Sequence, residues 1–78
     1  MEQTAYFKAT RQRPDRAWID DDWILRTIER PEREQEQPDG RIRFWRVIPE
    51  AEHRILRVVT LADRHVVHNA FFDRRAKL

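Results

Sequence analysis

One histidine and a few arginines are the residues of this chain whose types and spacing suit catalysis. His68 lies in an apolar run and precedes a basic group at positions 74–77. RNA cleavage without a metal requires a group that takes the 2′-OH proton, a group that protonates the leaving 5′ oxygen, and cations at the phosphate. We interpret His68 and Arg74, with Arg11 or Arg13, as candidates for these roles. The alternative for His68 is a partly buried strand histidine that bonds a neighbouring carbonyl.

A second group mixes arginine with tryptophan on one face of an expected strand. Arg41, Arg43 and Trp45 alternate along the chain, and alternate residues of a strand point to the same face. This pattern can hold a phosphate backbone and stack a base, so these residues, with Lys8 and Arg75, are candidates for RNA binding. The alternative for each single arginine is a solvated surface charge.

Composition excludes several kinds of site. The chain has no Cys, so neither a disulfide nor a thiol-ligated zinc site can form. It has no Ser and a single glycine, Gly40, which excludes a glycine-rich phosphate loop. His65 and His68 are three residues apart, so on a strand they point to opposite faces and cannot share one ion. We expect neither a metal nor a cofactor.

The charges are divided unevenly along the 78 residues. Residues 1–39 hold seven basic and ten acidic side chains, whereas residues 40–78 hold nine basic and four acidic ones. Fourteen of the 16 basic residues are Arg, whose planar donors suit phosphate and carboxylate groups. The arginine-rich half is expected to face RNA, DNA or an acidic protein, unless it only keeps a small protein soluble.

The length predicts a single domain over 1–78, with 73–78 as a basic flexible tail. No apolar run approaches the roughly 18 residues of a membrane span. The N-terminal residues 1–4 lack the basic and apolar parts of a signal peptide. We therefore expect a soluble, cytoplasmic protein with no membrane partner.

Turn residues divide the chain into elements. We expect a short strand around Tyr6 and Phe7, and a helix that starts at the acidic run 20–22 and ends near Arg30, before Pro31. An edge strand over 32–37 and strands over 41–48, 54–61 and 66–72 follow, separated by turns at 38–40, 49–52 and 62–65. This order predicts an α+β fold, with one main helix on a small antiparallel sheet of about four strands.

The expected helix has two different sides. A helical wheel places one apolar set toward the sheet: Trp18, Ile24, Leu25 and Ile28. Ile19 and Trp23 fall on the other side, beside Arg26 and Arg30. Trp23, Arg26 and Arg30 are thus candidates for binding a partner protein, because Trp and Arg are frequent interface anchors. The alternative is that the N-terminal arm folds over Trp23.

The order of elements resembles that of the RelE/ParE superfamily of toxins from bacterial type II toxin–antitoxin systems, and is most similar to its BrnT-like branch. The resemblance covers nearly the whole chain and is carried by five segments: 6–11, 18–32, 39–45, 55–60 and 66–74. It implies one or two helices on a curved antiparallel sheet, and a metal-independent endoribonuclease that acts on RNA or the ribosome. It also implies a hetero-oligomer with a cognate antitoxin.

Two departures from the family pattern bear on activity. Many relatives have a His-Ala pair followed by Arg after the first element, where this chain has Lys8 and Ala9, with Arg11 retained. The chain also ends soon after the segment 69–74, without a longer C-terminal part. The alternative to a toxin enzyme is therefore a non-catalytic module that binds protein or nucleic acid, such as a gyrase-poison-like protein or an accessory subunit.

Overall fold

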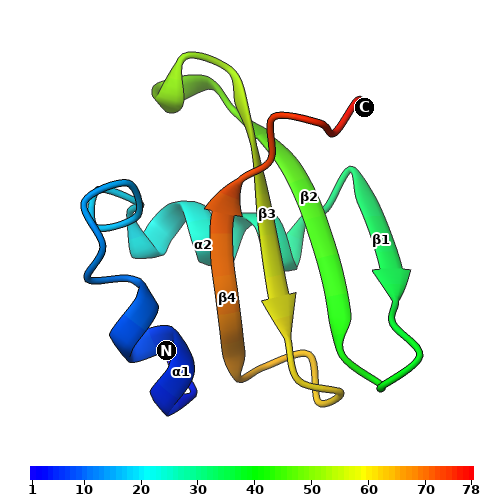
Figure 1. Cartoon of the computed structure of the whole chain (residues 1–78). Coiled ribbons are helices and arrows are strands. Elements are labelled where there is room, and N and C mark those ends of the chain that lie inside the picture. The colour runs from blue at the N-terminus through cyan, green and yellow to red at the C-terminus, as the bar shows by residue number, and fades with distance from the viewer.

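The computed structural model describes all 78 residues and has two helices and four strands (Figure 1). In chain order the elements are α1 (Ala5–Thr10), α2 (Asp21–Glu29), β1 (Arg33–Glu36), β2 (Ile42–Ile48), the 3-10 turn η1 (Pro49–Ala51), β3 (Arg54–Thr60) and β4 (Val67–Phe72). The predicted α+β fold, with a helix on a small antiparallel sheet, is confirmed. No helix has the length and apolar character needed to cross a membrane.

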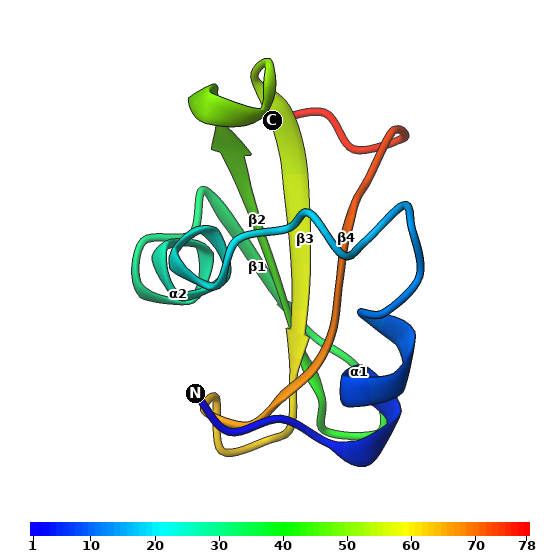
Figure 2. The same ribbon diagram turned by 90° about the vertical axis from the view of Figure 1, so that its left-hand side faces the viewer.

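The four strands pair in chain order, and each pair is antiparallel. Helix α2 packs on one face, against β2 and β3, whereas α1 lies beside β4 on the opposite side (Figure 2). No helix covers β1, β2 and β3 on that opposite side (Figure 1). We call this the open face; it carries the odd-numbered residues of β1, β2 and β3, together with Asn69 and Phe71 of β4.

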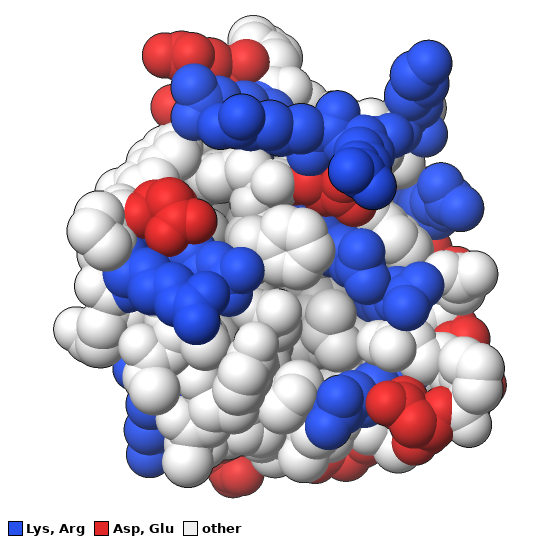
Figure 3. Space-filling model, viewed as in Figure 1, with Lys and Arg blue, Asp and Glu red and all other residues white.

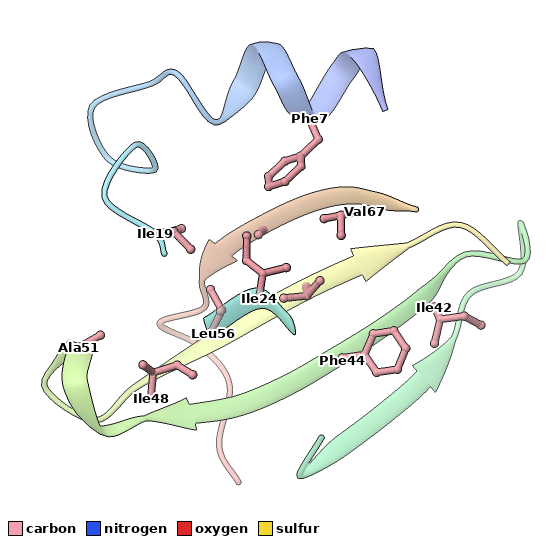
Figure 4. Close-up of a cluster of buried hydrophobic side chains, with 11 residues drawn as sticks. Phe7, Ile19, Ile24, Ile42, Phe44, Ile48, Ala51, Leu56 and Val67 are labelled. Carbon is pink, nitrogen blue, oxygen red and sulfur yellow. The ribbon is translucent and has the colours of Figure 1, made fainter. Parts of the chain in front are cut away.

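The hydrophobic core lies between α2 and the covered face of the sheet. Phe7 of α1 points toward β4, and Ile24 of α2 lies over the strands (Figure 4). The cluster holds eleven buried residues: Phe7, Ile19, Ile24, Ile42, Phe44, Ile48, Ala51, Leu56, Val58, Val67 and Ala70. One apolar layer of this size is all that a short chain can build, so the open face must be stabilised in another way.

Local signals define both ends of α2. The Asp20 side chain caps the helix by accepting a hydrogen bond from the Asp22 amide, and acidic residues in the first turn complement the helix dipole. The helix ends at Glu29, two residues before Pro31, which cannot continue it. Both predicted limits of this helix are confirmed within a residue or two.

The first element was predicted as a strand around Tyr6 and Phe7, and this prediction is wrong. The structure has helix α1 there, capped by Thr4, whose Oγ1 accepts a hydrogen bond from the Phe7 amide at 3.1 Å. Phe7 and Thr10 are the buried residues of α1 and are one helical turn apart. Two adjacent aromatic residues suggest a strand, but a six-residue helix needs only one buried side chain per turn.

The predicted sides of α2 are also partly wrong. Leu25 is 40% exposed and Trp18 is 44% exposed, whereas Ile19 is only 4% exposed. The helix begins after Asp20, so the wheel does not apply to the two residues before it. Trp23 packs against the core and contacts the Trp18 ring edge-on, with 5.9 Å between centroids. The exposed anchor predicted at Trp23 is therefore covered by the segment that precedes the helix.

The turn between β2 and β3 holds two consecutive residues in the left-handed region, Glu52 at φ 58° and His53 at φ 59°. Such a conformation costs a non-glycine residue about 1–2 kcal/mol. We expect Glu52→Gly to raise the free energy of unfolding by about 0.5–1 kcal/mol, after the entropy cost of glycine. Glu52→Ala is the matched control, because it removes the ion pair with Arg54 but keeps the strain. Urea unfolding of both variants measures the difference, and equal stabilities would contradict the prediction.

Candidate nucleic-acid interface

Arginines and aromatic rings alternate in one line across the open face. Arg33, Trp45, Arg57 and Phe71 occupy paired positions, one from each strand, and Arg16 extends the line beyond β4. The distances from guanidinium carbon to ring centroid are 4.9 Å for Arg33 on Trp45, and 5.5 and 5.2 Å for Arg57 on Trp45 and Phe71. Arg16 lies 5.4 Å from the Phe71 centroid. We call these five residues the arginine–aromatic row.

The row replaces the layer that a helix would provide. Each cation–π contact contributes about 0.5–1 kcal/mol, and more when the pair is desolvated. Trp45 is only 4% exposed although no helix lies over it, because Arg33 and Arg57 flank its ring. The base-stacking role predicted for Trp45 therefore requires one of these guanidinium groups to move aside.

Asp73 fixes the start of the C-terminal segment to the row. Its Oδ2 accepts a hydrogen bond from the Trp45 indole at 3.1 Å, and its amide donates to the Ile55 carbonyl at 2.9 Å. Burial favours a raised pKa for the Asp73 carboxyl, but the bonds from Trp45 and the Arg75 amide, with the Arg57 charge, lower it below 3.8. The segment predicted to be a flexible tail thus begins with an anchored residue.

Arg57 carries a positive charge that the protein compensates poorly. Its side chain is 23% exposed and makes no hydrogen bond, and its nearest carboxylate oxygen, on Asp73, lies at 3.9 Å. Burial and the charge of Arg43 lower the pKa of Arg57, and Asp73 only partly opposes them. Arg43 itself donates one hydrogen bond, to Gln35 at 3.2 Å. Of these two neighbouring guanidinium groups, only Arg57 has a carboxylate nearby, and Arg43 has none.

The positive charge extends beyond this pair. Figure 3 views the open face and shows Lys and Arg side chains in separate groups across it, with Asp and Glu beside some of them. Of the predicted RNA-binding residues, Arg43 lies in β2 and Arg41 directly precedes that strand. The Arg41 guanidinium lies 3.6 Å from a carboxylate oxygen of Asp39. Arg75 is exposed in the C-terminal segment and Lys8 is exposed on α1. The surface as a whole suits a polyanion.

The predicted catalytic residues are not brought together. His68 lies near the start of β4, whereas Arg74 lies in a turn beyond the end of that strand at Phe72. Arg11 pairs with Asp21 and donates to Gln3 at 3.0 Å, so it ties α1 to the start of α2. Arg13 is exposed in the segment that follows α1.

His68 has a defined environment of its own. Its Nδ1 lies 3.0 Å from Thr4 Oγ1, and its ring stacks on Tyr6 with 4.9 Å between centroids. Burial, and then the charge of Arg41, lower the pKa of His68 below 6.5, against a smaller opposing effect of Asp39. These effects favour the neutral form of the imidazole. Its partner is a threonine hydroxyl rather than the backbone carbonyl considered from the sequence.

The residues predicted to bind a partner protein are engaged within the chain. Arg26 donates to Glu50 at 2.7 and 2.9 Å and to Asp22 at 3.3 Å. The hydrogen bonding from Arg26 to Glu50 is the main reason that the pKa of Glu50 falls from 4.5 to about 2. Arg30 is exposed at the end of α2, and its carbonyl accepts a hydrogen bond from Arg46. With Trp23 covered, this side of α2 serves mainly to fasten the helix to the β2–β3 turn.

Sequence reasoning missed Arg57, Arg33 and Arg16, although one signal was available. The turn at 49–52 predicts a hairpin, and a hairpin fixes which residues face each other. The position of Trp45 opposite Arg57 depends on the register of this hairpin. Residue spacing alone defines that register only to within one or two residues. Arg16 comes from a loop and has no periodic signal at all.

Comparison with known proteins yields no match to a family model, to a curated protein or to a solved structure. The functional argument therefore depends on the geometry of the side chains.

Stability in acid should report on two of these carboxylates. Folding lowers the pKa of Asp73 below 3.8 and that of Glu50 to about 2. Both carboxylates therefore stabilise the protein at pH values above their pKa in the unfolded chain. This stabilisation is lost as the pH falls through their pKa in the folded protein. We expect Asp73→Asn to lower the melting temperature at pH 7 and to flatten its fall below about pH 4. Glu36→Gln, on an exposed strand, is the control, and identical pH curves for Asp73→Asn and wild type would contradict the prediction.

Proposed function

We propose that this protein binds single-stranded RNA through the open face of its sheet. The observation that supports the proposal most directly is the pair Arg43 and Arg57, whose charges repel each other while only Arg57 has a carboxylate nearby, at 3.9 Å. A phosphate that accepts hydrogen bonds from both guanidinium groups would relieve their repulsion. A chain of phosphates suits this pair together with the surrounding arginines.

The aromatic rings prepare the arginines for this role. Arg57 is held between Trp45 and Phe71, and Arg33 lies against the other side of Trp45. A guanidinium that is already fixed loses little entropy when a phosphate binds. The rings support the cations, so binding depends mainly on phosphate contacts and has low sequence selectivity.

The dimensions suit a single strand. Four strands cover about 14 Å at the usual spacing, which is comparable to the two or three nucleotides that four-stranded sheets hold in other RNA-binding folds. The double variant Arg43→Gln/Arg57→Gln tests this contact. We expect at least about tenfold weaker binding of a labelled oligouridine in fluorescence anisotropy, since bonds to charged groups contribute about 1.5–3 kcal/mol each. The salt slope should fall by about 0.7 per lost phosphate.

Arg30→Gln is the control, because it makes the same kind of substitution, with the loss of one positive charge, at the end of α2 on the covered side. It should retain the affinity within about twofold. Circular dichroism confirms that each variant is folded. Equal affinities for the double variant and the control, or an unchanged salt slope, would refute the interface, and tighter binding of oligodeoxythymidine would assign it to DNA instead.

A second candidate is an endoribonuclease toxin that acts in the cytoplasm and is neutralised by an antitoxin. It is favoured by the neutral imidazole of His68, which lies beside Tyr6 and within the electrostatic influence of Arg41. A neutral imidazole can take a 2′-OH proton, and Arg41 can hold the phosphate. In this candidate RNA or the ribosome is the target, and the antitoxin is a hetero-oligomeric partner.

Induced expression in a bacterial host tests this candidate. If His68 is the base, wild type should arrest growth and create new RNA 5′ ends, and His68→Ala should reduce cleavage at least about 100-fold. Arg74→Ala should matter little for that step, because Arg74 lies beyond the far end of β4 from His68. Normal growth with an unchanged RNA profile, from a chain shown to be folded, would exclude the toxin and leave the binding function.

A further inference from the structure

A groove of about 620 Å³ opens at one end of the sheet, between the β3 and β4 ends and the segment that precedes α2. Its lining includes three arginines and three aromatic rings: Arg16, Arg54, Arg74, Trp18, Phe71 and Phe72. Arg16 and Phe71 also belong to the arginine–aromatic row, whereas Phe72 packs against the core, so the groove lies at the end of β4 and meets the open face on one side.

The two kinds of lining residue lie where one small ligand can contact both. Trp18 stacks on Phe72 with 4.9 Å between centroids, and Arg54 lies 5.6 Å from the Trp18 centroid. Arg74 is exposed and makes neither a hydrogen bond nor an ion pair. Arg54 has only an exposed ion pair with Glu52 at 3.3 Å, which contributes little to stability. Both cations are therefore available to an anion.

Backbone strain at the rim is a separate observation. Glu52 and His53 adopt consecutive left-handed conformations directly before Arg54, and His53 lines the groove. Strained residues of this kind concentrate at ligand sites, because the surrounding structure must hold them in place. Here the strained turn fixes the position at which β3 begins, and with it the Arg54 side chain.

We propose that the groove binds one nucleotide of the RNA strand that crosses the open face, an inference that rests on the proposed function. The phosphate contacts Arg54 and Arg74, and the base lies against the exposed ring of Trp18. The volume is in the range of pockets that hold ligands of this size. Base–aromatic stacking is tolerant of sequence, so any of the four bases can occupy the site.

Uridine monophosphate is a direct probe of the groove, and two NMR signals locate its binding. The Trp18 indole N–H donates to the Asp15 carbonyl, and both residues line the groove. Gly40, the single glycine, gives a recognisable amide signal from the turn between β1 and β2. We expect millimolar uridine monophosphate to shift the Trp18 signal and to leave Gly40 in place.

The variant Arg54→Gln/Arg74→Gln should weaken binding of uridine monophosphate at least about tenfold, whereas Arg30→Gln should retain it within about twofold. Uridine and inorganic phosphate are tested separately. If phosphate alone binds as tightly as the nucleotide, the base has no site here and the proposal is overturned.

The groove and the open face can fail independently. If oligouridine binds through Arg43 and Arg57 but the mononucleotide shifts no signal at Trp18, the groove proposal is wrong and the proposed function stands. If the mononucleotide binds in the groove but oligouridine does not bind, the open face is not an RNA interface, and the groove is a site for free nucleotides. Binding of both, each weakened by its own pair of substitutions, supports the two proposals together.

Discussion

The hydrogen bond from the Trp45 indole to Asp73 is the contact on which the open face depends. It joins the middle of the sheet to the C-terminal segment, while Arg33 and Arg57 flank the same ring. A chain of 78 residues has one helix long enough to cover a sheet face, and α2 occupies the other side. The second face is therefore closed by cation–π contacts and one carboxylate, rather than by a second apolar layer.

These contacts leave the positive charge of Arg57 poorly compensated. The same charge affects both the stability of the protein and the proposed binding of RNA. Asp73 is the nearest carboxylate to Arg57, yet Arg43 lies close enough to lower the pKa of Arg57. A second carboxylate at that point would increase the stability of the free protein but would repel a phosphate. Poor compensation at Arg57 is physically reasonable if an anionic ligand completes the pair, because the same charge that disfavours the free state favours the bound one.

Features that depend on residues close together in the chain could be predicted from the sequence. Features that depend on the register between strands could not. The turns at 38–40 and 49–52 and the acidic start of α2 predicted the sheet hairpins and the main helix, because turn and cap residues act within a few positions. The pairing of Trp45 with Arg57 depends on a register that one residue can shift. Helix α1 and the loop residue Arg16 are fixed by tertiary contacts, which have no periodic pattern in the chain.

The outer edge of the sheet, formed by β1, carries charges that disfavour pairing with another strand. β1 exposes its outer edge and all four of its residues are exposed. Pairing with a second copy in a register that keeps the faces aligned would oppose Glu34 to itself, or Glu34 to Glu36 of the other chain. Like charges directly opposite each other destabilise a strand pair, so this edge disfavours extension of the sheet. Glu34, which pairs with Arg64, and Glu36 therefore disfavour the addition of a second copy of β1 at this edge.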